Sequence, residues 1–221
     1  MTEAVALDAR SPQVRPRVGT SGRLLRILAN LVGAAGAAYF AEVSFHAYLQ
    51  THRPIGAAFF VEQTLVVLAY LIRRPATVMT RRWGDWLLAF GGTFVPVLLR
   101  PGGAHPEWGF QAGLVLQIIG LAICISSFVA LGRSFGFAAG DRGLVQRGPY
   151  SVVRHPIYAG YLFLQIGYVL QSLSVRNIVV VLVAIACNAG RAVVEDRILA
   201  NNPAHADYRR RVRFRLVPGV W

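Results

Sequence analysis

The sequence predicts an all-α fold: a polytopic transmembrane helix bundle of about six spans, ending in a tight helical hairpin and a cytoplasmic or interfacial C-terminal segment. Hydrophobic residues make up 55% of the 221 residues, and the mean hydropathy is +0.47. That is too apolar for an ordinary soluble domain. Six apolar runs approach the length needed to cross a bilayer core of about 30 Å as a helix. The cations are all arginines, and they gather in alternate gaps between these runs.

The expected elements begin with a basic tail. Residues 1–22 mix Pro, Gly, Ser and Arg with few large apolar side chains, which is typical of a mobile segment. The first apolar run continues to Leu49, past any cleavage site, so it indicates a transmembrane helix rather than a secretory signal. Only "SVR" separates the last two runs, which should therefore form a tight antiparallel hairpin. The expected spans are 24–49, 55–72, 83–99, 110–131, 156–173 and 177–196.

The arginines predict the orientation. With a cytoplasmic N-terminus, the inner segments hold 20 arginines, and the outer ones hold three, Arg53, Arg100 and Arg176. This bias predicts that both termini face the cytoplasm. The arginine-only cations are compatible with a GC-rich bacterial genome, and hence with a bacterial inner membrane. A net charge of +13 confined to the gaps between spans favours the lipid bilayer as partner and argues against nucleic acid.

The loop 132–155 and the start of the following helix form the first candidate site. The loop carries five glycines, which permit close approach to a ligand. Pro156 suits the first turn of a helix, and the free backbone donors of that turn are expected to face a ligand carboxylate or phosphate. Arg147, Arg154 and His155 stand beside this helix start. The alternative is that the arginines only follow the positive-inside bias and that His155 caps the helix.

The helix 156–173 has two distinctive faces. Gly160 and Gly167, seven residues apart, should let a neighbouring helix come close. A polar stripe at spacings of 3 and 4 should face the bundle interior or a cavity, because lipid would not favour it. Hydrogen bonding between helices is the alternative explanation. The stripe consists of Tyr158, Tyr161, Gln165, Tyr168 and Ser172.

Charged residues are most concentrated at the end of the last expected span. Asn188, Arg191 and Glu195 share one helix face, and Asp196 points about 100° away around the axis. An arginine inside the membrane boundary needs a function or a partner. Arg191 and Glu195 could also form a plain ion pair across one helical turn.

Other titratable groups suggest little further chemistry. Cys124 and Cys187 lie in apolar runs, with no disulfide or metal pattern. Glu42, His46 and Glu62 lie near the outer side, where the two acids could pair and share a proton. They provide the sequence's one indication of an ion or proton path.

The blocks "GPYSVVRHPIYAG", "RAVVEDRIL" and "YRRRVRFRLVPG" resemble the isoprenylcysteine carboxyl methyltransferase family of integral membrane methyltransferases. The broader group includes phospholipid N-methyltransferases. The resemblance covers residues 110–221 and implies that this region is catalytic, whereas residues 23–109 hold the helices that shape the acceptor side. It also implies S-adenosylmethionine as cofactor, with Arg191 and Glu195 as catalytic residues. The implied cofactor-binding residues are Gln146, Gly148, Pro149, Tyr150, Arg154, His155, Tyr158, Gly160, Asp196 and Tyr208.

The expected function is transfer of a methyl group from S-adenosylmethionine to a lipophilic or membrane-associated acceptor. A carboxylate of a prenylated cysteine-like group needs only an orienting cation, for which Arg191 is the candidate. A lipid amine or a thiol must lose a proton, for which Glu195 is the candidate base. The alternatives are a nicotinamide-dependent membrane reductase and, outside enzymology, a small transporter or proton path through Glu42, His46 and Glu62.

Overall fold

The computed structural model describes residues 20–52, 54–80, 82–100, 107–200 and 202–221. Apart from residues 20–22, which begin the first helix, the predicted tail 1–22 lies outside the described residues. The α-helices are α1 (Thr20–Thr51), α2 (Pro54–Ile72), α3 (Trp83–Phe94), α4 (Glu107–Leu131), α5 (Pro156–Gln171), α6 (Val175–Leu199) and α7 (Pro203–Arg211). Short elements are the 3-10 helices η1 (Val95–Leu98), η2 (Gly132–Ser134) and η3 (Gly148–Ser151), and the strands β1 (Val78–Met79) and β2 (Gly140–Asp141).

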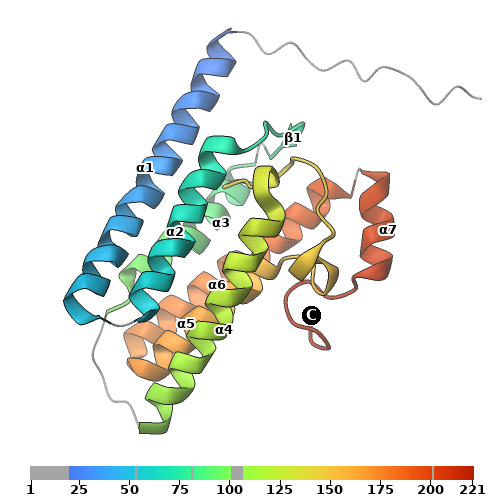
Figure 1. Ribbon diagram of the computed structural model, residues 1–221. Coiled ribbons are helices and arrows are strands. Elements are labelled where there is room, and N and C mark those ends of the chain that lie inside the picture. Colours follow the sequence, from blue (N-terminus) through green and yellow to red (C-terminus); the bar gives the residue numbers. More distant parts are fainter. Residues whose placement is uncertain (1–19, 53, 81, 101–106, 201) are drawn as a thin grey trace, which may run out of the picture.

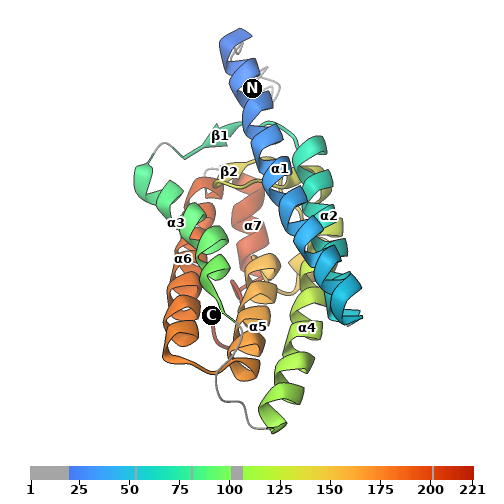
Figure 2. The ribbon, with the colours of Figure 1, turned by 90° about the vertical axis from the view of Figure 1, so that its left-hand side faces the viewer.

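The six long helices pack in pairs (Figure 1). α1 lies along α2, α4 along α5, and α3 along α6. In Figure 2 the α1–α2 pair lies on one side and the α3–α6 pair on the other, with α5 between α6 and α4. α7 and the C-terminal segment lie at the end of the bundle where α6 finishes. Five of the predicted spans coincide with α-helices, the span 83–99 corresponds to α3 and η1, and the prediction of a helical bundle is confirmed.

The helices differ in whether they are long and apolar enough to span a membrane. Among the described residues, two helical stretches are long and apolar enough to cross a membrane, Glu107–Ser134 and Val175–Leu199. Gly56–Ile72 is apolar but shorter. The expected span 83–99 is α3 followed by η1, because Pro96 lacks the N–H that would continue the α-helix. The arrangement of six spans stays a prediction.

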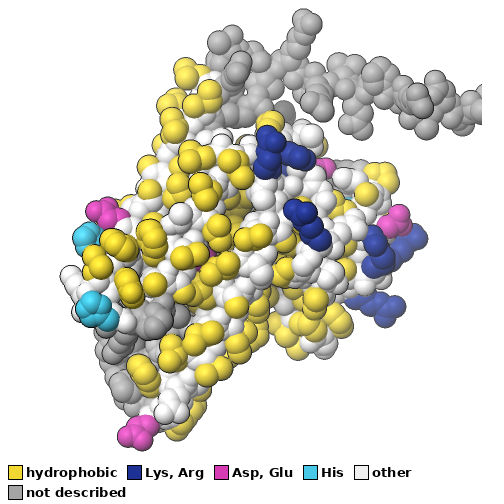
Figure 3. All heavy atoms as spheres, in the orientation of Figure 1, with side chains coloured by type: hydrophobic (Ala, Val, Ile, Leu, Met, Phe, Trp, Pro, Cys, Tyr) yellow, Lys and Arg dark blue, Asp and Glu magenta, His cyan; other side chains and the backbone are white. Residues whose placement is uncertain are grey.

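Large apolar side chains cover much of the outer surface. Leu87 on α3, Val129 on α4 and Leu182 on α6 are 71%, 63% and 61% exposed. Figure 3 shows yellow apolar side chains spread over the visible face of the helices, whereas the dark-blue arginines lie toward the end that carries α7. A soluble monomer rarely exposes so much contiguous apolar surface. This outer surface suits a lipid environment.

The pair α4–α5 is held by reciprocal glycine contacts. A Cβ on Gly160 would lie 2.8 Å from the Gly120 carbonyl oxygen, and one on Gly167 would lie 2.6 Å from that of Gly113. The backbones therefore touch, and only glycine fits at these crossings. The predicted close helix approach along Gly160 and Gly167 is confirmed, and it fixes the face that α5 turns toward the bundle interior.

A single asparagine organises the predicted hairpin between α5 and α6. Ser174 caps α6 by accepting from the Asn177 backbone N–H. The Asn177 side chain donates to the carbonyls of Ser172 and Arg100, at 2.7 and 2.9 Å, and accepts from the Arg100 N–H. A fully buried amide with its bonds satisfied gives a rigid turn. The tight hairpin is confirmed.

The loops at the opposite end are tied by short backbone pairings. β1 and β2 pair antiparallel, Val78 with Asp141 and Met79 with Gly140, a two-residue ladder that an all-α prediction omitted. The C-terminal segment also returns to the start of α5. The N–H groups of Arg154 and His155 donate to the carbonyls of Phe214 and Arg215, at 3.0 and 2.9 Å. These contacts fix the backbone on which the candidate site is built.

Candidate functional site

A cavity of about 540 Å³ opens within the bundle. Its wall combines α2, the end of α3, the loop after α4, one face of α5, the end of α6 and α7. The polar stripe contributes Tyr158, Tyr161, Gln165 and Tyr168 to this wall, and Ser172 is buried at the end of α5. The prediction that the stripe faces a cavity is confirmed for these four residues.

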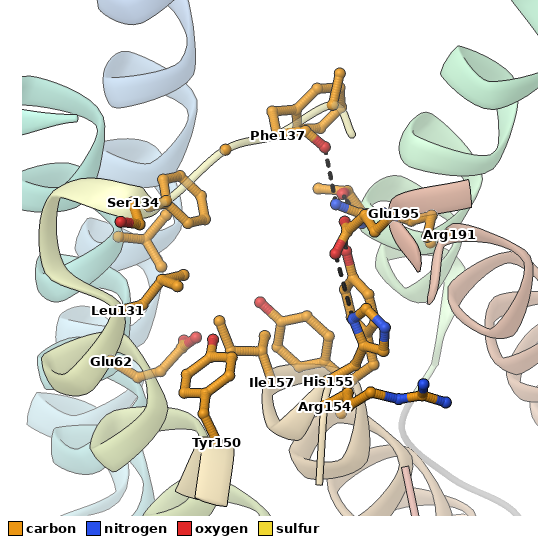
Figure 4. A pocket seen from close by; sticks show the side chains of 18 of the residues that line it. Glu62, Leu131, Ser134, Phe137, Tyr150, Arg154, His155, Ile157, Arg191 and Glu195 are labelled. Atoms are coloured by element: carbon orange, nitrogen blue, oxygen red, sulfur yellow. Dashed lines mark hydrogen bonds and ion pairs between the residues drawn. The ribbon is translucent and has the colours of Figure 1, made fainter. Parts of the chain in front are cut away.

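His155 lies between two carboxylates at one side of the cavity (Figure 4). Its Nε2 lies 3.0 Å from Asp196 Oδ1, and its Nδ1 lies 3.4 Å from Glu195 Oε2. Both ring nitrogens thus face acceptors, which favours the imidazolium, the form that donates from both. The Tyr158 hydroxyl donates to the other oxygen of Glu195. Tyr158, Glu195, His155 and Asp196 therefore form one continuous hydrogen-bonded chain.

Asp196 is the fixed end of this chain. It is 3% exposed, and Arg215 Nε donates to its Oδ2 at 2.8 Å. Arg154 Nη2 lies 3.4 Å from the same oxygen, and His205 Nε2 lies 3.8 Å from Oδ1. Both carboxylate oxygens already have partners, so Asp196 orients His155 and anchors the C-terminal segment at Arg215.

Arg191 is buried beside this chain and does not form the simple ion pair with Glu195 that the sequence allowed. Its Nη2 donates to the Phe137 carbonyl at 2.8 Å, and its Nη1 donates to Thr93 Oγ1 at 3.3 Å. The guanidinium stacks over the Tyr158 ring, 4.9 Å from its centroid. Arg191 thus joins α6 to α3 and to the loop after α4, and it also lines the cavity.

Burial and charge shift several groups in the loops around the cavity. Burial alone would lower the pKa of His155, but its hydrogen bonds to Asp196 and Glu195 raise it above 6.5. Burial, followed by the nearby charge of Arg73, lowers the pKa of Arg142 to about 10, so this group stays charged at pH 7. Burial raises the pKa of Tyr150 well above 10, so its hydroxyl stays protonated. At the loop side of the cavity Arg142 and His155 are therefore cations, and Tyr150 is neutral.

Several polar atoms of the wall are buried without a partner. Among the described residues these include Arg154 Nε and His205 Nδ1 at the loop side, and Glu62 Oε1 and Gln165 Oε1 on α2 and α5. Burying an unpaired polar atom costs free energy, so such atoms indicate where ligand groups bind. The cavity therefore presents unpaired polar atoms both at the loop side and on α2 and α5.

Eight of the twelve sequence-predicted site residues line the cavity: Tyr150, Arg154, His155, Tyr158, Arg191, Glu195, Asp196 and Tyr208. The other four do not line the cavity. Gly160 packs on α4, and Gln146 accepts from Arg211 at 2.5 Å. Gly148 has a φ of 59°, a backbone conformation that favours glycine, and together with Pro149 it begins the turn η3. The Tyr208 hydroxyl donates to the Tyr150 carbonyl of this turn at 2.7 Å.

Two predictions about local chemistry are wrong. The first-turn N–H groups of Tyr158 and Ala159 both donate to the His155 carbonyl, so they are not free for a ligand. Glu42 and Glu62 do not pair. Glu42 is exposed on α1, 3.9 Å from His46, whereas Glu62 is 2% exposed and faces the same cavity as Arg191 and Glu195. α2 turns its polar face inward and α1 does not, so the three groups form no single path.

The sequence did not reveal the residues that hold the site residues in place through contacts between distant parts of the chain. Thr93 and Phe137 hold Arg191, and Arg215 and His205 approach Asp196. No spacing rule connects these positions, because the contacts join segments far apart in the chain. Among the described residues, no group of His, Cys, Asp and Glu could hold a metal ion.

Comparison with known proteins supports the sequence motifs. A family model described as "Phospholipid methyltransferase" matches residues 108–202. The Arabidopsis thaliana protein named "Protein-S-isoprenylcysteine O-methyltransferase A" is 33% identical over 76 residues, which cover 32% of this chain and 39% of that protein. The chain therefore matches well under half of that relative's length. Both comparisons confirm the resemblance to the isoprenylcysteine carboxyl methyltransferase family over the residues that they match.

Proposed function

We propose that the protein transfers a methyl group from S-adenosylmethionine to a lipophilic or membrane-associated acceptor inside this cavity. The observation that carries the proposal is the buried chain of Tyr158, Glu195, His155 and Asp196 beside Arg191, which lies within the segment matched to methyltransferases. The acceptor is a carboxylate of a prenylated cysteine-like group, a lipid amine or a thiol.

The loop side of the cavity suits the cofactor. Small-molecule sites commonly have volumes of about 300–1,000 Å³, and this cavity falls in that range. Arg154 Nε is a buried donor without a partner, and it fits the carboxylate of an amino-acid tail. Arg154, His155, His205, Tyr150 and Tyr208 would hold the cofactor, which supplies a methyl group activated on a sulfonium.

The residues of the chain would position the acceptor and handle its proton. Arg191 has used two of its five N–H groups on Thr93 and Phe137, so others remain to orient an acceptor carboxylate. For an amine or thiol acceptor, Glu195 would accept the proton, with Tyr158 and His155 holding its two oxygens in place. Catalysis then rests on positioning and electrostatics.

The same proposal includes the membrane setting. Six spans, both termini in the cytoplasm and a bacterial inner membrane agree with the arginine distribution and the apolar outer surface. A lipophilic acceptor would then reach the cavity from the bilayer, and the cofactor would reach it from the cytoplasm. The helices of residues 23–109 would shape the acceptor side, and residues 110–221 would hold the catalytic region.

Cofactor binding to the purified protein in detergent tests the proposal. We expect S-adenosylmethionine and its demethylated product to raise the melting temperature, and a reduced nicotinamide dinucleotide phosphate to leave it unchanged. His155→Ala should weaken binding of both cofactor forms at least tenfold, whereas His46→Ala, at an exposed histidine of α1, should not. Stabilisation by the nicotinamide cofactor alone would favour the reductase, and failure to bind S-adenosylmethionine would overturn the methyltransferase.

A further inference from the structure

Arginines line a second, open depression, formed by the loop before α5, α7 and the C-terminal segment 212–221. These three parts of the chain meet because the C-terminal segment returns to the start of α5. Of the residues that line this depression, Arg154 alone also lines the cavity. We call it the arginine depression, and its wall is made of Arg154, Ala206, Arg209, Arg210, Arg213 and Arg215.

Two of these arginines share one carboxylate. Asp196 Oδ2 lies 2.8 Å from Arg215 Nε and 3.4 Å from Arg154 Nη2. Burial lowers the pKa of Arg154; Asp196 opposes this effect, whereas the positive charges of Arg215 and Arg209 add to it. A single negative charge therefore stands against two close positive ones, with a third nearby.

The three exposed arginines of the depression add charge that the protein barely balances. Arg210 Nη1 lies 3.7 Å from Asp207 Oδ1, but both side chains are largely exposed, and such a pair contributes little. Arg209 and Arg213 are exposed and form no ion pair within the part of the chain that the structure describes. Several guanidinium groups around one depression suit a phosphate, whose oxygens accept from the planar forks of arginine.

Apolar side chains beside the depression indicate that the phosphate belongs to a lipid. Val152, two residues before Arg154, and Val220 are both more than half exposed. The Arg215 guanidinium lies 5.0 Å from the ring centroid of Trp221, which is itself exposed. Figure 3 shows dark-blue arginines of α7 next to yellow side chains of the C-terminal segment. Tryptophan and arginine beside exposed apolar groups are typical of a membrane interface, and a soluble anion would need only the arginines.

We propose that the arginine depression binds the phosphate of an anionic phospholipid, whose acyl chains then lie along the apolar outer surface of the bundle. This lipid is not the methyl acceptor: phosphatidylglycerol carries the required charge without an amine, a thiol or a carboxylate. The inference goes beyond the proposed function and requires only that the helices lie in a bilayer. Because Arg154 and Arg215 share Asp196, the bound phosphate would also hold the C-terminal segment against the loop before α5.

Titration with three probes tests the proposal, with the melting temperature of the protein in lipid-free detergent as the measure of binding. Phosphatidylglycerol combines a net negative charge with acyl chains. Phosphatidylcholine has the same phosphate and chains but no net charge, and inorganic phosphate has the charge without the chains. We expect phosphatidylglycerol to raise the melting temperature to a plateau, with an affinity at least about tenfold higher than that of either other probe.

Paired double variants show whether the lipid binds at this depression. Arg209→Gln with Arg213→Gln should lower the affinity for phosphatidylglycerol at least about tenfold, because both exposed cations of the wall are removed. The matched control is Arg74→Gln with Arg82→Gln, which removes two exposed arginines from the segment between α2 and α3. The control should keep the affinity within about threefold of wild type, since it leaves the depression intact. Without added lipid, both double variants should melt close to wild type.

Four results would overturn the proposal. An equal loss of affinity in both double variants would mean diffuse attraction to charge and no site. Equal stabilisation by phosphatidylcholine would show that the net charge of the lipid is not recognised. Inorganic phosphate that binds as tightly as phosphatidylglycerol would assign the depression to a soluble anion. Loss of S-adenosylmethionine binding together with lipid binding in Arg209→Gln/Arg213→Gln would make the depression part of the cofactor site.

Discussion

At the scale of single residues, the charge of His155 gives a pH-dependent stability. Its pKa in the folded protein lies above 6.5, because the two carboxylates outweigh the effect of burial. The imidazolium therefore stabilises the folded state fully below pH 6.5, and this contribution is lost as the pH rises through the folded-state value. We expect the melting temperature of wild-type protein in detergent to fall over that range. His155→Gln should show a flatter profile, and His46→Gln should follow wild type; parallel profiles for wild type and His155→Gln would contradict the assigned charge.

Arg191 has two possible roles, orienting the acceptor and supporting the fold, and mutation can distinguish between them. If it orients an acceptor carboxylate, Arg191→Ala should lower single-turnover methyl transfer about a hundredfold, since one well-placed donor contributes roughly 3 kcal/mol in the transition state. Cofactor affinity should stay within a few-fold of wild type. Arg191→Lys should not restore the rate, because a point charge cannot hold Phe137, Thr93 and a ligand together.

The control for Arg191 is Arg209→Ala, which removes an exposed arginine from α7. It should leave both rate and melting temperature close to wild type. Arg191→Ala with near-wild-type transfer would place the acceptor elsewhere in the cavity. A fall in melting temperature with an unchanged rate would mean that Arg191 only joins α6 to the loop after α4.

At the scale of elements, the α4–α5 contact depends on glycine. A side chain at Gly167 would meet the Gly113 carbonyl at 2.6 Å, and the backbone cannot yield as a flexible side chain would. We expect Gly167→Val to destabilise the protein by about 1–3 kcal/mol through overpacking. Gly36→Ala on α1 meets nothing within 4 Å and should instead stabilise by about 0.4–1 kcal/mol. Thermal melting in detergent measures the stability of both variants. If Gly167→Val and Gly36→Ala changed the stability equally, α4 and α5 would separate more easily than these contacts imply.

At the scale of the whole molecule, the predicted orientation can be tested by cysteine labelling in intact cells. Val175→Cys lies at the first residue of α6, next to the α5–α6 turn, and Ala206→Cys lies on α7, at the opposite end of the bundle. We expect a membrane-impermeant thiol reagent to label the first and to reach the second only after permeabilisation. The parent chain sets the background, because Cys124 is buried and Cys187 is partly so. The reverse pattern would invert the topology.

The sequence by itself determined the helices, their approximate ends, the α5–α6 hairpin and the inward faces of α5. Apolar run length, helical spacing and the positions of proline and glycine are local properties, and local properties define elements. For the same reason the sequence identified His155, Tyr158, Arg191 and Glu195, which fall within two short motifs and line one cavity.

The tertiary structure alone decided which of these groups share a contact. It separated Glu62 from Glu42, placed Thr93 and Phe137 on Arg191, and brought Arg215 to Asp196. The reason is physical: α5 turns its polar stripe toward the cavity because its glycine face packs against α4. Spacing along the chain fixes which residues share a face, and only packing between helices fixes what that face meets.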